Sequence, residues 1–292
     1  MSHLNLLPPK VDFVFKRIFG NEKHLNILTS FLNAVLLPQH PIVSVTLKDT
    51  TIEKEHLEDK YSRLDVLAIT NTGEQINIEI QLRHHHNFSK RTLYYWSKVY
   101  SSQLAQGATY ELLSKTICIN LLDFHYLPAT NYHSIYKVMN IENHHLLSDV
   151  FEIHFIELPK LKTFNDIKEI KNKLEAWIQF INAPESEVVM ELSKYETEIN
   201  EAREELIRLS ANPTERALYE RRFESLIDKV DAQIHAEKRG EKRGEIRGEI
   251  RGKQIKALEI ATSLLDILDD DTIALKTGLS FDEVVQLRRE HS

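Results

Sequence analysis

Residues 61–83, which read YSRLDVLAITNTGEQINIEIQLR, predict a β-hairpin that carries two acidic residues. Both arms are rich in Ile, Val and Leu, as buried strands are. Between the arms, residues 71–73 (NTG) suit a three-residue hairpin loop with glycine in the left-handed conformation. The register that this loop imposes places Asp65 directly opposite Glu79. The sequence therefore predicts two carboxylates at one place.

Two facing carboxylates create an electrostatic conflict. At a separation of about 5 Å and an effective dielectric constant of about 20, two ionised carboxylates repel by on the order of 3 kcal/mol. Either one carboxyl is protonated or a cation lies between them, and a hard divalent ion such as Mg²⁺ or Mn²⁺ prefers oxygen ligands. Alternation along the second arm places Asn77, Glu79, Gln81 and Arg83 on one face. We therefore expect a compact polar site there.

These residues carry a resemblance to a known family. Asp65 followed by Glu79-Ile80-Gln81 resembles the metal-binding signature of the PD-(D/E)XK nuclease superfamily, in which an Asp precedes a Glu-x-Lys strand. The chain more closely resembles the Rpn family of recombination-promoting nucleases and transposases, over residues 8–180. The segments that carry this resemblance are 12–20 (DFVFKRIFG), 58–60 (EDK) before Asp65, 91–97 (RTLYYWS), 119–124 (INLLDF) and 152–159 (EIHFIELP).

The resemblance implies an α/β fold of the restriction-endonuclease type, with a central mixed sheet flanked by helices. It also implies a divalent-metal-dependent DNA endonuclease. On this basis Asp65 and Glu79 bind the metal ion together with the backbone carbonyl of Ile80, and Gln81 orients the attacking water. The family's biological roles leave recombination, transposition and defence against foreign DNA open.

Gln81 departs from the superfamily pattern, because a lysine stands at this place in the motif. A glutamine cannot supply the positive charge that stabilises the transition state of phosphoryl transfer, so Lys16 or Lys98 would supply it from a neighbouring helix. Asp12 would add a third acidic ligand. The residues alone also allow a simpler interpretation, in which Asp12 and Lys16 form an exposed ion pair four positions apart on one helix.

The net charge of −7 is unevenly distributed. Residues 1–160 carry a net −1, residues 184–236 a net −6 and residues 237–253 a net +3. The acidic excess thus lies in the tail, and a local basic groove for DNA is compatible with the first part. The single cysteine, Cys118, lies in an apolar run and is expected to be a buried packing residue.

No apolar run approaches the roughly 20 residues of a membrane span, and the N-terminus lacks the pattern of a signal peptide. We therefore expect a cytoplasmic protein without a membrane partner.

Hydrophobic periodicity predicts the following elements of the first domain: helices at 12–37, 89–107 and 167–181, and strands at 42–52, 115–124, 133–141 and 151–158, in addition to the hairpin. The strand at 115–124 is expected to be buried on both faces, which suits a parallel partner reached through the preceding helix.

The predicted domain organisation has four parts: 1–183 as the nuclease-like domain, 184–236 as a charged helical extension, 237–253 as a linker and 254–292 as a small helical segment. In the linker, glycine recurs every fourth residue from Gly240 to Gly252, which opposes a stable helix. It is either flexible or a nucleic-acid-binding arm. The last segment, with a capping box at Ser280 and Glu283, is either a helix-turn-helix for DNA or a helical hairpin for self-association.

Other function classes remain open from the sequence. The missing lysine is also consistent with a catalytically inactive relative that keeps the fold as a DNA-binding or assembly module. A glycosidase-like use of the two carboxylates is less favoured, because directly opposed residues on one hairpin lie at the close end of the separations that such enzymes need.

Overall fold

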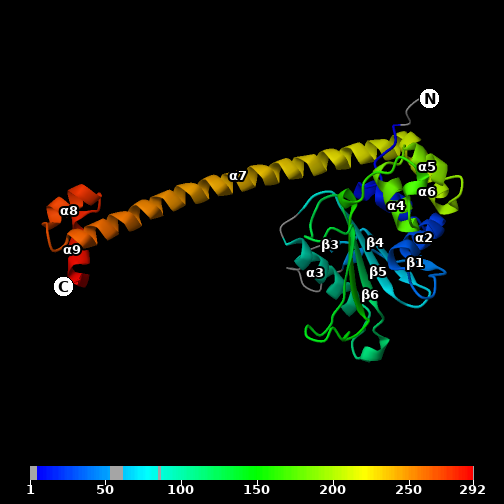
Figure 1. Cartoon of the computed structure of the whole chain (residues 1–292), viewed down its shortest axis with the longest axis horizontal. Helices are drawn as coiled ribbons and strands as arrows, with labels where there is room; N and C mark the ends of the chain where they lie inside the picture. The colour runs from blue at the N-terminus through cyan, green and yellow to red at the C-terminus, as the bar shows by residue number, and fades with distance from the viewer. Residues whose placement is uncertain (1–4, 53–61, 85–86, 292) are drawn as a thin grey trace. The chain divides into compact units, whose positions relative to one another are not determined.

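The computed structural model describes residues 5–52, 62–84 and 87–291 (Figure 1). The predicted motif segment 58–60 lies outside these residues. The chain forms two compact units, one up to Glu220 and one from Arg221 onward. Across the described ranges, each helix is too short or too polar to cross a membrane.

A mixed six-stranded sheet forms the centre of the first unit. Its strands lie in the order β1 (Val45–Leu47), β4 (Val66–Thr70), β5 (Gln75–Gln81), β6 (Thr116–Leu122), β8 (Phe151–Glu157) and β7 (His133–Tyr136). The three central strands β5, β6 and β8 run parallel, and the outer pairings are antiparallel. A separate short ribbon pairs β2 (Thr51–Ile52) with β3 (Ser62–Arg63). The mixed sheet and the parallel pairing of β6 confirm the predicted α/β fold.

The hairpin of β4 and β5 has the predicted register, with Val66 opposite Ile78. Its loop ends at Gly73, whose φ of 91° requires a residue that tolerates the left-handed region. Since opposed residues alternate between hydrogen-bonded and non-hydrogen-bonded pairs, Asp65 and Glu79 fall at a non-hydrogen-bonded pair, where side chains approach most closely. The loop chemistry therefore fixes where the two acids meet.

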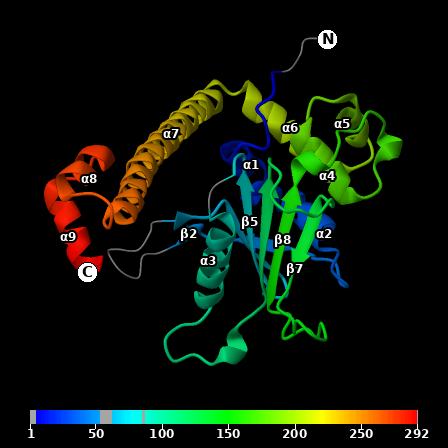
Figure 2. The ribbon, with the colours of Figure 1, turned by 60° about the vertical axis from the view of Figure 1, so that its left-hand side comes forward.

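Helices cover both faces of the sheet (Figures 1 and 2). Helix α3 (Phe88–Ser101) packs on β5 and β6, on the face toward which Glu79 points. Thr92 of α3 marks this face, because its hydroxyl bonds to Asn120, the neighbour of Glu79 on β6. The other face carries α1 (Asp12–Phe19) and α2 (Leu25–Leu36).

The helix predicted at 12–37 is broken into α1 and α2. The chain turns at Gly20 and Asn21, and the Asn21 side chain accepts a hydrogen bond from the backbone of Lys23 at 3.0 Å. A Cβ on Gly20 would lie 2.8 Å from the carbonyl oxygen of Lys16, so a larger residue would disturb this turn. The apolar periodicity continued across the break and hid it.

Several predicted boundaries also moved. The strand at 42–52 is interrupted between β1 and β2, and the strand at 133–141 ends at Tyr136. The helix predicted at 89–107 is the shorter α3, which ends at Ser101, and Gly107 lies in a later turn with φ of 84°. The remaining elements of this unit are η1 (Glu22–His24), η2 (Tyr110–Leu112), η3 (Leu158–Lys160), η4 (Ile167–Glu169), α4 (Lys173–Asn182), α5 (Glu187–Leu192) and α6 (Thr197–Ala211).

The first unit extends beyond the predicted boundary at residue 184. Helices α5 and α6 bury Val189, Ile199 and Leu206 completely, although their sequence is highly charged. Helix α4 packs mainly on α2, and its Trp177 also lies edge-on to Phe19 of α1 at 5.5 Å between ring centroids. The apolar stripes of these helices complete the core, so residues 184–220 are part of the compact unit and not an exposed extension.

The second unit contains most of α7 (Pro213–Leu264), with α8 (Asp270–Thr277) and α9 (Phe281–His291). A small core of Ala261, Ile273 and Val284 joins the end of α7 to α8 and α9. The capping box is confirmed, since Ser280 N–H donates to the Glu283 carboxylate at 2.7 Å and Glu283 N–H donates to the Ser280 hydroxyl at 3.3 Å.

The glycine repeat at 237–253 was predicted as a linker, but α7 passes through it without a break. The residues between the glycines are Glu, Arg, Lys and Ile, most of which favour helices. The preference of these residues opposes the penalty of about 1 kcal/mol at each glycine. The predicted flexible linker is therefore helical.

Candidate active site

Asp65 immediately precedes β4 and lies beside Glu79 of β5. The chain leaves the ladder there, because Leu64 N–H donates to the carbonyl of Thr50 on another segment. Ile80 N–H consequently lacks its usual ladder partner and donates to Asp65 Oδ2 at 2.9 Å. Asp65 N–H in turn donates to Glu79 Oε1 at 3.3 Å. The two predicted carboxylates thus share one small region, and both are buried.

Helix α1 adds a cation to this pair. Lys16 Nζ lies 2.8 Å from Asp65 Oδ1, and the Lys16 side chain is only 26% exposed. The interpretation of Asp12 and Lys16 as an exposed ion pair is therefore replaced by a contact between Lys16 of α1 and Asp65 of the hairpin. Asp12 stands at the first position of α1, and its charge contributes to raising the pKa of Asp65.

Burial sets the protonation of the two acids. It raises the pKa of Glu79 to about 8, with the charge of Asp65 as the next cause. It also raises the pKa of Asp65, against the opposing effects of the Lys16 ammonium and the Ile80 N–H. At neutral pH Glu79 therefore holds a proton while Lys16 neutralises Asp65. The repulsion predicted between the two carboxylates is thus relieved in both ways, by a proton on Glu79 and by a cation beside Asp65.

Helix α3 supplies a second cation, Arg91. The Arg91 charge lowers the pKa of Glu79, although less than burial raises it. The guanidinium lies 5.2 Å from the centre of the Phe88 ring and 5.8 Å from that of Tyr95. Its Nη2 atom is buried with no hydrogen-bond partner in the described part of the chain. Lys98 was predicted as a site residue and Arg91 was not. The signal that points to Arg91 is the pair of aromatic residues, Phe88 and Tyr95, that lie beside it on the same helix.

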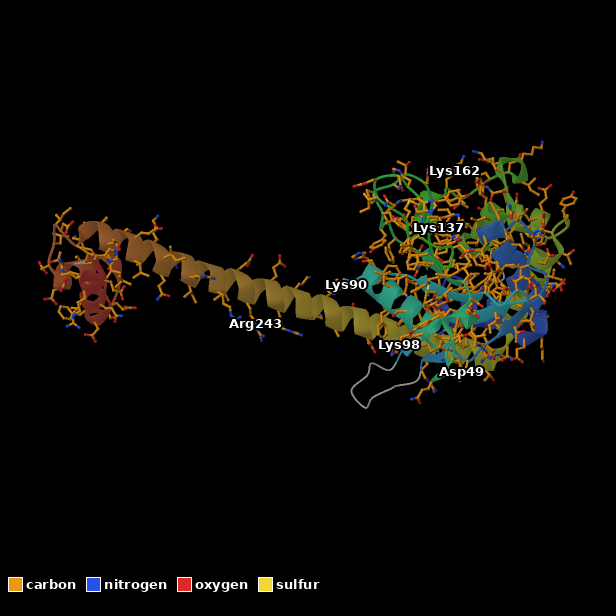
Figure 3. All side chains as sticks on the ribbon, turned by 90° about the horizontal axis from the view of Figure 1, so that it is seen from below. Asp49, Lys90, Lys98, Lys137, Lys162 and Arg243 are labelled. Carbon is orange, nitrogen blue, oxygen red and sulfur yellow. The ribbon has the colours of Figure 1, made fainter. Side chains whose placement is uncertain are left out.

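Lys98 and Gln81 lie farther along their elements. Lys98 is seven residues beyond Arg91, which is about 10 Å along a helix, and its Nζ lies 6.0 Å from the centre of the Tyr94 ring (Figure 3). Gln81 ends β5, two residues after Glu79 on the same face, and its carbonyl accepts the N–H of Asp123. Gln81 is half-buried, so its amide is close to the surface.

The oxygen donors around Asp65 and Glu79 can provide some of the ligands that a hard divalent cation needs. Two carboxylates and the backbone carbonyl of Ile80 are oxygen donors of the kind that Mg²⁺ and Mn²⁺ prefer. Among the residues that the structure describes, no group of three or more His, Cys, Asp or Glu side chains is arranged around one point. Mg²⁺ usually takes only one or two carboxylates and keeps waters or substrate oxygens as further ligands. The pair Asp65 and Glu79 satisfies that smaller requirement.

A second buried polar cluster lies on the opposite face of the sheet. His154 is fully buried, and its Nε2 lies 2.7 Å from Glu152 Oε1 while its Nδ1 lies 2.8 Å from His133 Nε2. Lys115 pairs with the same glutamate at 2.8 Å. Because His154 is in register with Ile119 on β6, and Ile119 with Ile78 on β5, the cluster is separated from Glu79 by the sheet. The cluster joins β7 and β8 to Lys115, the residue just before β6.

A mixed sheet flanked by helices, with an Asp and a Glu facing each other on one hairpin, defines a nuclease-like α/β protein. The model of the PD-(D/E)XK nuclease family transposases matches residues 9–236, and the chain belongs to this family. No curated protein and no solved structure matches the chain.

Proposed function

We propose that this protein is a divalent-metal-dependent DNA endonuclease of the recombination-promoting nuclease and transposase type. The observation that carries the proposal is the burial of Asp65 beside Glu79, with the pKa values of both raised. Such a pair is costly to a fold without a compensating role. Because the chain belongs to a nuclease family, metal binding is the simplest role for this buried pair of carboxylates.

Each residue of the site then has a task. Asp65, Glu79 and the carbonyl of Ile80 would hold Mg²⁺ or Mn²⁺. Asp12 is not grouped with the two carboxylates around one point, so it would act through its charge on Asp65 and not as the predicted third ligand. The ion, when bound, lowers the pKa of a water molecule and neutralises charge on the scissile phosphate. Glu79 must release its proton before it can act as a ligand. The Gln81 amide would orient the attacking water.

Positive charge would come from side chains on the two flanking helices. Lys16 on α1 and Arg91 on α3 approach the carboxylates from different elements. They would stabilise the charge that develops on the phosphate, in place of the lysine that Gln81 replaces. We assign Lys98 to the DNA backbone at a distance from the scissile bond, because it lies about two helical turns beyond Arg91.

A plasmid-nicking assay tests the proposal. Supercoiled DNA with Mg²⁺ or Mn²⁺ should be nicked by the wild type, and the double variant Asp65→Ala, Glu79→Ala should be inactive. Glu74→Gln is the matched control, because Glu74 is an acid on the same hairpin that bonds to the loop threonines instead. Equal cutting by the wild type and the double variant would show that another site or a contaminant cleaves.

The second candidate is a catalytically inactive DNA-binding or assembly module. Gln81 favours this candidate, because it removes the motif lysine. DNA binding without cleavage under Mg²⁺, Mn²⁺ or any other divalent ion would support it over the nuclease.

We further propose a cytoplasmic location, since the chain's single cysteine, Cys118, is a buried free thiol.

We also propose self-association through the C-terminal helices. In the glycine repeat of α7, Arg239, Arg243, Arg247 and Arg251 form one row, and Glu241, Glu245 and Glu249 form another about 200° around the helix. Figure 3 labels Arg243 in the first row. Two parallel copies could place the Arg row of one against the Glu row of the other. Sedimentation of the full chain should show an oligomer that the double variant Arg243→Glu, Arg247→Glu weakens, and a monomeric wild type would refute this.

A further inference from the structure

Both carboxylate oxygens of Asp65 already accept a hydrogen bond, and the one on Oδ1 comes from a cation. Its Oδ1 accepts Lys16 Nζ at 2.8 Å, and its Oδ2 accepts Ile80 N–H at 2.9 Å. The second contact comes from the backbone of β5 and is fixed by the sheet. The first comes from a side chain with four rotatable bonds. Lys16 is therefore the partner that can leave.

We propose that Lys16 occupies the metal position on Asp65 in the metal-free protein and transfers to a DNA phosphate when a divalent ion binds. This inference rests on the proposed nuclease function. It adds that the Lys16 ammonium and the divalent ion compete for Asp65. An ammonium and a dication on the same carboxylate oxygen repel each other strongly in a buried site. Binding of the ion therefore expels the Lys16 head group, and the same event frees its charge for the substrate.

The surroundings allow this movement without unfolding α1. Phe15, Ile18 and Phe19 are fully buried on the inner face of the helix, which fixes its backbone. Lys16 sits beside them with part of its side chain exposed. A rotation about its side-chain bonds moves the ammonium from Asp65 toward solvent, where a bound DNA backbone would lie. The Lys16 ammonium, once released, thus supplies the positive charge that a lysine provides in the superfamily motif and that Gln81 lacks.

The alternative is a permanent ion pair that only fastens α1 to the hairpin. The two alternatives predict opposite effects on metal affinity. If Lys16 competes with the ion, its removal tightens metal binding. If it only holds Asp65 in place, its removal loosens the ligand and weakens metal binding or leaves it unchanged.

Calorimetric titration of the full chain with Mn²⁺, without DNA, separates them. We expect Lys16→Met to bind Mn²⁺ about tenfold more tightly than the wild type, within the usual range of coupling between two sites. Lys16→Arg keeps the charge and should stay near wild type. Lys10→Met is the matched control, because Lys10 forms a 2.8 Å pair with Asp123 just before α1. Thermal melts establish that each variant folds, and Lys16→Met should gain more stability from Mn²⁺ than the wild type does.

DNA affinity in Ca²⁺, compared with affinity in EDTA, tests the transfer of Lys16. Ca²⁺ should strengthen binding of a duplex oligonucleotide by the wild type several-fold more than binding by Lys16→Met. Equal or weaker Mn²⁺ binding by folded Lys16→Met, or an equal gain from Ca²⁺ in both proteins, would overturn the inference. A wild type that binds no divalent ion would instead refute the proposed nuclease function, so the two failures are distinguishable.

Discussion

Asp65 and Glu79 are joined across one hairpin by a 3.3 Å hydrogen bond from the backbone N–H of Asp65 to Glu79 Oε1. The bond couples the backbone of one acid to the side chain of the other. It also holds the two carboxyl groups close enough for the charge of Asp65 to raise the pKa of Glu79.

The stability of the metal-free protein should fall as the pH rises. Glu79 titrates at about 8 in the fold, against an ordinary value of 4.5. Between these values the folded state binds more protons than the unfolded state, so the free energy of unfolding decreases with increasing pH. The loss should be on the order of a few kcal/mol at most. Urea denaturation in EDTA at pH 5.5, 7 and 8.5 measures it. Glu79→Gln should show a flatter dependence, whereas Glu74→Gln should follow the wild type.

Metal affinity should change with pH in the opposite sense. An ion that binds Glu79 must displace its proton, so affinity should increase as the pH passes through about 8. Mn²⁺ titration at pH 6.5 and 8.5 should show a gain on the order of tenfold, with proton release that depends on the buffer used. Affinity that is independent of pH would mean that Glu79 is not a ligand.

Replacement of Arg91 should shift the pH profile of cleavage. The Arg91 charge lowers the pKa of Glu79, so Arg91→Met should raise that pKa further. The rising limb of activity against pH should move to higher pH, and cleavage at pH 7 should fall about tenfold. Arg91→Lys keeps a positive charge, so its pH profile should lie between those of the wild type and Arg91→Met. A uniform loss with an unmoved profile would limit Arg91 to a structural role.

Lys98→Met should affect DNA binding instead of the chemical step. One phosphate contact fewer should reduce the slope of log K against log salt by about one. The rate at saturating DNA should stay near that of the wild type. Lys162→Met is a suitable control, since Lys162 pairs with Glu169 at 2.8 Å on a different segment. A large fall in the saturated rate for Lys98→Met would place Lys98 at the scissile phosphate.

Local chemistry explains which parts of the fold were predictable. The loop before Glu74 needs a left-handed residue, and Gly73 supplies it, so the register of the hairpin followed from the sequence. The strand at 115–124 was expected to be buried on both faces, which likewise indicated the parallel pairing of β6. The break at Gly20 was missed because apolar periodicity continued on both sides of it. The burial of α5 and α6 was missed because a narrow apolar stripe was hidden among many charges.

The site was only half predictable for a similar reason. Asp65 and Glu79 lie on neighbouring strands of one hairpin, so short-range geometry brings them together. Lys16 and Arg91 approach from separate helices, and their contacts depend on how those helices pack on the sheet. A sequence gives the residue types on a helix face but not the distance of that face from a strand. Lys16 was therefore assigned to phosphate, and its pairing with Asp65 could not be foreseen.

Anomalous diffraction from crystals soaked in Mn²⁺ tests the central claim most directly. We expect one strong peak between Asp65 and Glu79, within about 2.0 to 2.3 Å of an oxygen from each. The Lys16 ammonium should have moved away from Asp65 Oδ1 in the same crystals. A saturating soak that gives a peak elsewhere, or no peak at the two carboxylates, would contradict it.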